Sequence, residues 1–106
     1  MNPFDMSNMG AMLGAFQQKM DEMKRRAETT EVEGSAASGK VVVRVTCAYD
    51  CTHVHIDPSV TDDAEMLEDL VRAATNEALR KARETTKRNM GELAQGLPIP
   101  PGLLGM

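Results

Sequence analysis

The sequence is poor in aromatic residues and in cysteine. Its 106 residues include no Trp, one Tyr, two Phe and two Cys. So few aromatic side chains argue against a strand surface on which single-stranded bases stack. Two cysteines are too few for the disulfide framework of a secreted domain, so we expect two free thiols in a reducing compartment.

Long apolar runs are also missing. The apolar runs are all far shorter than the roughly 18 residues that cross a bilayer. The N-terminus shows no basic region followed by a hydrophobic core, which is the pattern of a signal peptide. We therefore expect a cytoplasmic protein with no membrane partner.

The motifs of common enzymes are absent. The chain has no Ser-His-Asp arrangement and no H-E-x-x-H, and Gly34 and Gly39 flank small residues without the Lys-Ser/Thr of a phosphate-binding loop. Asp62 and Asp63 are paired acids, but they lie where a helix is expected to begin and complement its dipole. We predict no enzyme, no cofactor and no small-molecule substrate.

Length and composition predict one domain, residues 1–97, followed by a flexible Pro/Gly tail, residues 98–106. Hydrophobic residues make up 42% of the chain, and nine of them are Met. Apolar surface built from thin, flexible side chains is more easily completed across a subunit interface than within one small chain. A dimer is therefore expected.

The N-terminal third predicts a helix over about residues 4–30. Its apolar residues alternate at spacings of three and four, which is the pattern of a coiled-coil seam. The seam consists of Met6, Met9, Leu13, Phe16, Met20, Met23 and Ala27.

The middle of the chain predicts a β-hairpin. Residues 33–39 are small and polar and are expected to form a connecting loop, followed by strands at about 40–48 and 51–57 with alternating apolar residues. A turn at Tyr49-Asp50 would oppose Cys47 to Thr52, Val45 to Val54 and Val43 to Ile56, giving one apolar face.

A second helix is predicted over about residues 62–93, with Thr61 or Asp62 as its cap and acids in its first turn. Its apolar stripe is Leu67, Leu70, Val71, Ala74, Ala78 and Ala82. The expected class is α+β, with a long N-terminal helix, an antiparallel hairpin or small sheet, and a long C-terminal helix.

Charge is distributed unevenly around a net charge of −4. Basic and acidic residues number five and six in residues 1–40, two and eight in 41–79, and five and two in 80–106. On the second helix, an arc of about 160° holds Arg80, Lys81, Arg83, Lys87 and Arg88. The first helix adds Lys24, Arg25 and Arg26.

These basic clusters have two interpretations. They form a phosphate-binding surface, duplicated in a dimer, or they are solvated faces that complement helix dipoles and pair with nearby acids. Charge pattern alone slightly favours the second interpretation.

Cys47, Cys51, His53 and His55 are the residue types of a zinc site within nine residues. The expected hairpin points Cys47 and Cys51 to opposite faces and places His53 and His55 beside Thr46 and Arg44. Four ligands cannot converge in that arrangement, so we predict no metal site.

Five segments together resemble the YbaB/EbfC family of nucleoid-associated proteins. They are V-E-G at 32–34, G-K-V-V-V at 39–43, V-H-I-D-P-S at 54–59, E-M-L-E-D-L-V at 65–71 and A-T-N-E-A at 74–78. The Met- and Gln-rich first helix and the P-P-G of residues 100–102 fit the same order.

The resemblance implies a tweezer-like homodimer that binds DNA with little or modest sequence preference and affects nucleoid organisation and gene expression. It implies DNA contacts on the projecting helices, at Lys24–Arg26 and Arg80–Arg88. The expected dimer interface and core are Met9, Leu13, Phe16, Met20, Met23, Val43, Val45, Val54, Ile56, Leu67, Leu70, Val71 and Ala74. The alternative is a protein-interaction module that uses the Met-rich helix without binding DNA directly.

Overall fold

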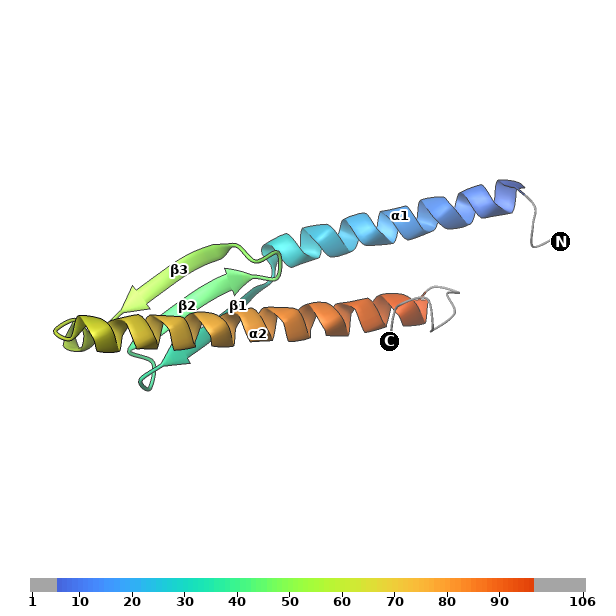
Figure 1. The fold of residues 1–106 in the computed structure, drawn as a ribbon. Helices are drawn as coiled ribbons and strands as arrows, with labels where there is room; N and C mark the ends of the chain where they lie inside the picture. Colours follow the sequence, from blue (N-terminus) through green and yellow to red (C-terminus); the bar gives the residue numbers. More distant parts are fainter. Residues whose placement is uncertain (1–5, 97–106) are drawn as a thin grey trace.

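Two long helices flank a three-stranded antiparallel sheet in the computed structural model, which describes residues 6–96 and the side chains of residues 9–95. In chain order the elements are α1 (Met6–Thr29), β1 (Glu31–Ala36), β2 (Val41–Thr46), β3 (Cys51–Ile56), the 3-10 helix η1 (Pro58–Val60) and α2 (Ala64–Gly96). The predicted α+β class is confirmed (Figure 1). The predicted tail at 98–106 lies outside the described residues.

The first strand replaces part of an expected loop. Residues 31–36 pair with β2 along their whole length, from Glu31 opposite Thr46 to Ala36 opposite Val41. The prediction of a connecting loop at 33–39 is wrong for this segment, because its small residues fit a strand that lies tightly against a helix. Only the connection to β2 is a turn, in which Ala37, Ser38 and Gly39 have φ of 54°, 57° and 88°, in the left-handed region that glycine adopts without steric cost.

The predicted register of the second hairpin is wrong by two residues. Val43 opposes Val54 rather than Ile56, and a β-bulge separates the pairing of Arg44 from that of Val45. The Thr46 hydroxyl accepts from the amides of Ala48 and Asp50, each at 3.2 Å, so the turn begins at Cys47. A shift of two residues keeps each side chain on its own face, and the apolar face of β2 survives.

A glycine allows β1 to lie directly on α2. A Cβ added to Gly34 would overlap the carbonyl oxygen of Ala74 and the amide nitrogen of Ala78. On the helix side, Ala74, Ala78 and Ala82 are completely buried and recur every four residues, so they form one stripe. Small residues on both elements therefore bring the two backbones into contact.

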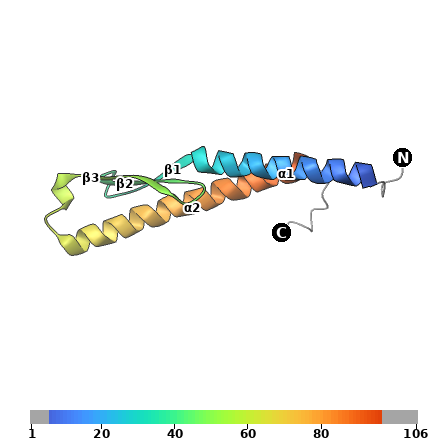
Figure 2. The same ribbon diagram turned by 90° about the horizontal axis from the view of Figure 1, so that it is seen from above.

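The core lies between this stripe and the inner face of the sheet. It consists of Val41, Val43, Val45, Val60, Ala74, Ala78 and Ala82, with Val32, Ala36, Ile56, Leu67, Leu70, Val71 and Leu79 packed around it. α2 packs against β1 and β2 and leaves Val54 on β3 49% exposed. Viewed along the sheet, α2 covers one face, and no other described helix covers the opposite face (Figure 2).

Short-range hydrogen bonds set where α2 begins. Asp57 caps η1 by accepting from the amide of Ser59 at 2.8 Å, and β3 ends at Ile56, one residue before the predicted bound. Asp63, rather than Thr61 or Asp62, then caps α2, because its carboxylate accepts from the amide of Met66 at 3.1 Å.

The molecule is elongated. Its extents are 70 × 23 × 17 Å and its radius of gyration is 19.8 Å, whereas a globular chain of this length has a radius of gyration of about 13 Å. The difference comes from α1 and the C-terminal part of α2, which run beyond the sheet to the same side (Figure 1). Within the described residues, no helix has the length and apolar character needed to span a membrane.

Candidate nucleic-acid interface

Three basic side chains line the outer face of α2. Arg80, Arg83 and Lys87 follow the spacing i, i+3, i+7, which places them on one side of a helix, and all three are exposed. Lys87 comes nine residues after Ala78, which rotates it by about 180° from the buried stripe. We call these three residues the basic ridge.

The basic ridge is only partly neutralised by the chain's own acids. Arg80 pairs with Glu84 at 3.1 Å, with both side chains more than half exposed. Among the described residues, Arg83 and Lys87 form no ion pair, and the neighbouring Arg88 bonds only to the Thr85 hydroxyl at 3.3 Å. Exposed ion pairs contribute about 0–1 kcal/mol, so Arg80 also remains available to another anion.

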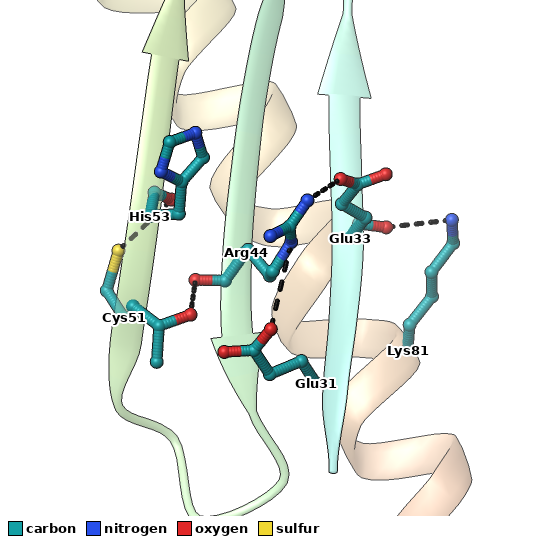
Figure 3. Close-up of polar contacts among 7 residues, drawn as sticks. Glu31, Glu33, Arg44, Cys51, His53 and Lys81 are labelled. Atoms are coloured by element: carbon teal, nitrogen blue, oxygen red, sulfur yellow. Dashed lines mark hydrogen bonds and ion pairs between the residues drawn. The ribbon is translucent and has the colours of Figure 1, made fainter. Parts of the chain in front are cut away.

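Lys81 differs from its basic neighbours. Its ammonium group donates to the carbonyl oxygen of Glu33 on β1 at 2.9 Å and lies 3.2 Å from the Glu77 carboxylate. Figure 3 shows this side chain rising from α2 to the edge of the sheet. Lys81 was among the DNA-binding residues expected from the sequence, but in the structure its contact with Glu33 attaches α2 to β1.

The basic cluster on α1 is divided in a similar way. Arg26 reaches across to α2 and pairs with Glu92 at 3.4 Å. This pair closes one side of a cleft of about 220 Å³ between the helices, lined by Lys19, Glu22, Met23, Arg26, Asn89, Glu92 and Leu93. Lys24 and Arg25 are exposed and have no ion pair among the described side chains.

The outer face of the sheet carries acidic groups around one arginine. The Arg44 guanidinium lies 2.8 Å from the Glu33 carboxylate and 3.9 Å from that of Glu31 (Figure 3). The hydrogen bond from Arg44 and its positive charge hold the pKa of Glu33 below the ordinary value of 4.5, and the same pair raises the pKa of Arg44. This face neutralises its own base and presents remaining carboxylate oxygens, which disfavours an approaching phosphate.

The cysteines and histidines of the hairpin do not converge. Cys47, in the turn after β2, is buried, and Cys51, at the start of β3, is exposed. The observed register puts His53 opposite Arg44 and His55 opposite Val42, each two residues from the predicted partner. No cluster of three or more potential metal ligands occurs among the described residues.

An apolar surface at the other end of the molecule had no clear signal in the sequence. Val54 is on the helix-facing side of β3 but beyond the edge of α2. On α2, Met66 is 42% exposed, and a shallow hollow of about 520 Å³ is lined by Ala64, Leu67, Glu68, Val71 and Arg72. Leu67 and Val71 were predicted as core or interface residues. Within one chain they pack against the core but are only partly buried.

Known proteins share this architecture and this sequence pattern. The structure is similar to the crystal structure of the uncharacterized protein HP0035 from Helicobacter pylori, with a TM-score of 0.78 and 19% sequence identity, over 86% of this chain and 98% of that one. At that identity the likeness shows the fold. The sequence profile of the YbaB/EbfC DNA-binding family matches residues 1–97, nearly the whole chain. The protein belongs to the YbaB/EbfC DNA-binding family.

Proposed function

We propose that this protein binds duplex DNA as a homodimer, with little or modest sequence preference, and thereby affects nucleoid organisation and gene expression in the cytoplasm. Its family consists of DNA-binding, nucleoid-associated proteins rather than enzymes. The observation that carries the proposal is the basic ridge on α2, where Arg83 and Lys87 have no acidic partner among the described residues and point away from the core.

The contacts we propose are to phosphates. Arg80 and Lys87 are seven residues apart, so the basic ridge spans about 10 Å along the helix axis, the length of about three base-pair steps. Lys24 and Arg25 on α1 and Arg88 on α2 are also exposed, and we propose them as further phosphate contacts. Phosphate contacts position a protein on DNA without reading bases, which supports low sequence preference.

The homodimer is supported by the uncovered surface around Val54. β3 is an edge strand, and an unpaired edge beside an exposed apolar side chain is a surface that a second chain can cover. The hollow on α2 that includes Leu67 and Val71 adds further apolar area. In a two-fold dimer joined there, the basic ridge is present twice, once on each chain.

The test is a salt titration of duplex DNA binding. Each lost phosphate contact reduces the slope of log affinity against log salt by about 0.9. We expect the double variant Arg83→Gln/Lys87→Gln to bind more weakly with a shallower slope. The matched control, Arg72→Gln/Lys40→Gln, removes the same charge at the acidic end of α2 and at the β1–β2 turn, and should retain the wild-type slope. Equal slopes for both variants would refute the basic ridge as the DNA-binding surface.

A protein-interaction module is the second candidate, favoured by the exposed Met9, Met12 and Leu13 on α1. In that case the purified wild-type protein shows no salt-dependent binding of duplex DNA, and neither double variant differs from it in the same assay. Affinity for supercoiled, linear and single-stranded competitors in the same assay separates the two functions.

A further inference from the structure

The part of α1 farthest from the sheet carries an apolar stripe that no described residue covers. Its side chains range from 38% exposed at Met20 to 66% exposed at Leu13. We call this set the distal stripe: Met9, Met12, Leu13, Phe16 and Met20. It is the largest group of exposed apolar side chains among the described residues, and such patches mark a binding surface.

The distal stripe extends past the end of α2. The two helices run side by side where Arg26 meets Glu92, and α2 has only four more residues, to Gly96. At 1.5 Å per residue, α2 ends near Glu22, and about 20 Å of α1 continues beyond it. Figures 1 and 2 both show α1 projecting past the end of α2.

The chain that leaves α2 at this point has the matching composition. Residues 97–106 read L-P-I-P-P-G-L-L-G-M, with five apolar side chains, three prolines and no charge. Residues 6–18 of α1 carry no charged side chain either. In a sequence that is 26% charged, two uncharged apolar segments that begin beside each other can pack without desolvating any charge.

We propose that residues 97–106 pack along the distal stripe of α1. A segment rich in proline favours the polyproline II conformation, at about 3.1 Å per residue, so it reaches roughly 30 Å and spans the uncovered helix. Proline also reduces the entropy that the segment loses when it becomes ordered. Because the segment is tethered at Gly96, its effective concentration at the stripe is about millimolar, and a modest contact area is sufficient.

A second copy of α1 is a poorer occupant of the same stripe. The 3-4 spacing predicts a coiled-coil seam, but coiled coils fix register and partner with charged residues beside the seam. The first charged side chain in α1 is Lys19, beyond most of the stripe. Gly10 and Gly14, with open space around their backbones, further weaken an isolated helix pair by about 1 kcal/mol each.

The proposal is tested by methyl NMR of the full-length protein with labelled methionines. Met9, Met12 and Met20 report on the distal stripe, and Met66 near the start of α2 is the internal control. We compare the wild type with a chain ending at Gly96 and with Leu103→Ser/Leu104→Ser, which keeps the tail length. In both variants we expect shifted Met9 and Met12 signals and faster relaxation by a soluble paramagnetic agent, with Met66 unchanged.

The reciprocal variant, Phe16→Ser, should move the Met106 methyl signal towards its random-coil position. Two results would overturn the proposal. Identical Met9 and Met12 signals in all three chains would show that the tail does not touch α1. Protection of Met9 and Met12 that rises with protein concentration and survives truncation at Gly96 would assign the stripe to a second copy. Circular dichroism of each variant checks that α1 stays helical.

Discussion

The two halves of α2 lie in different surroundings. From Ala74 to Ala82 the helix lies against the sheet, and its inner residues are completely buried. From Arg83 to Gly96 it runs beyond the sheet beside α1, where Glu92 pairs with Arg26 and Leu93 is buried. The first half has small side chains and close backbone contact, whereas the second has exposed bases. The part of α2 that is packed against the sheet therefore positions the charged part that projects, which is the arrangement that a binding surface needs.

Gly34→Ala should disrupt the packing of the first half of α2 against the sheet more than any other substitution considered. The added methyl group would meet backbone atoms of Ala74 and Ala78, and backbone cannot move aside as a flexible side chain can. We expect a loss near the upper end of the 1–3 kcal/mol typical of overpacked cores, about 3 kcal/mol, measured by urea unfolding.

Gly91→Ala is the matched control for that substitution. Gly91 is in the projecting half of α2, and apart from its own stretch of helix nothing lies within 4 Å of the position that an added Cβ would take. Helix propensity then predicts a gain of up to about 1 kcal/mol. Losses of similar size in both variants would contradict the contrast between the two halves of α2.

Both long helices were predictable from the sequence because their apolar residues recur with helical spacing over many turns. The edge strand β1 was not. Gly34, Ser35 and Ala36 have the composition of a loop, and only the tertiary contact explains why a strand needs a glycine there. The hairpin register was predicted wrongly for a local reason. The Thr46 hydroxyl accepts hydrogen bonds from two amides of the turn and so competes with strand pairing.

The candidate site was predictable in outline only. Charge counting located the basic residues on both helices, but it could not separate Lys81 and Arg26 from the rest. Their partners, Glu33 and Glu92, are 48 and 66 residues away in sequence, and no local pattern signals such contacts. The bases without an acidic partner among the described residues, which include Arg83 and Lys87, are distinguished only after folding.

Val54→Ser tests whether the sheet end of the molecule is completed by a second chain. Burying a valine contributes about 1.5–3 kcal/mol, and a two-fold interface counts each substitution twice. With Val54 half covered already in one chain, we expect dimer dissociation to become about ten- to a hundredfold easier in sedimentation equilibrium. His55→Ser, on the outer face of the same strand, is the control. Unchanged dimerisation in Val54→Ser would place the interface elsewhere.

Lys81→Gln separates attachment of α2 from DNA binding. The lost hydrogen bond to the Glu33 carbonyl oxygen should cost about 1 kcal/mol of unfolding free energy, because the ammonium group is held at the edge of the sheet. Arg83→Gln removes an exposed charge and should leave stability within about 0.5 kcal/mol. For salt-dependent DNA binding the order reverses, with Arg83→Gln giving the larger change in slope. The same order in both measurements would contradict the separate roles.

The smallest expected effect is the acid sensitivity of the sheet's outer face. Arg44 lowers the pKa of Glu33 below 4.5, so the folded state binds a proton less readily than the unfolded state. This contribution to stability is complete above the ordinary glutamate pKa and is lost as pH falls through the lowered pKa of the folded state. The stability difference between wild type and Glu33→Gln should therefore be constant near neutral pH and shrink below about pH 4.5. In an Arg44→Gln background the difference should lose most of this pH dependence, because the two largest causes of the shift are gone and only the weaker effects of the Lys81 and His53 charges still lower this pKa. Asp57, whose pKa is also lowered, by the amide and hydroxyl of Ser59, titrates equally in all four proteins and cancels from the comparison.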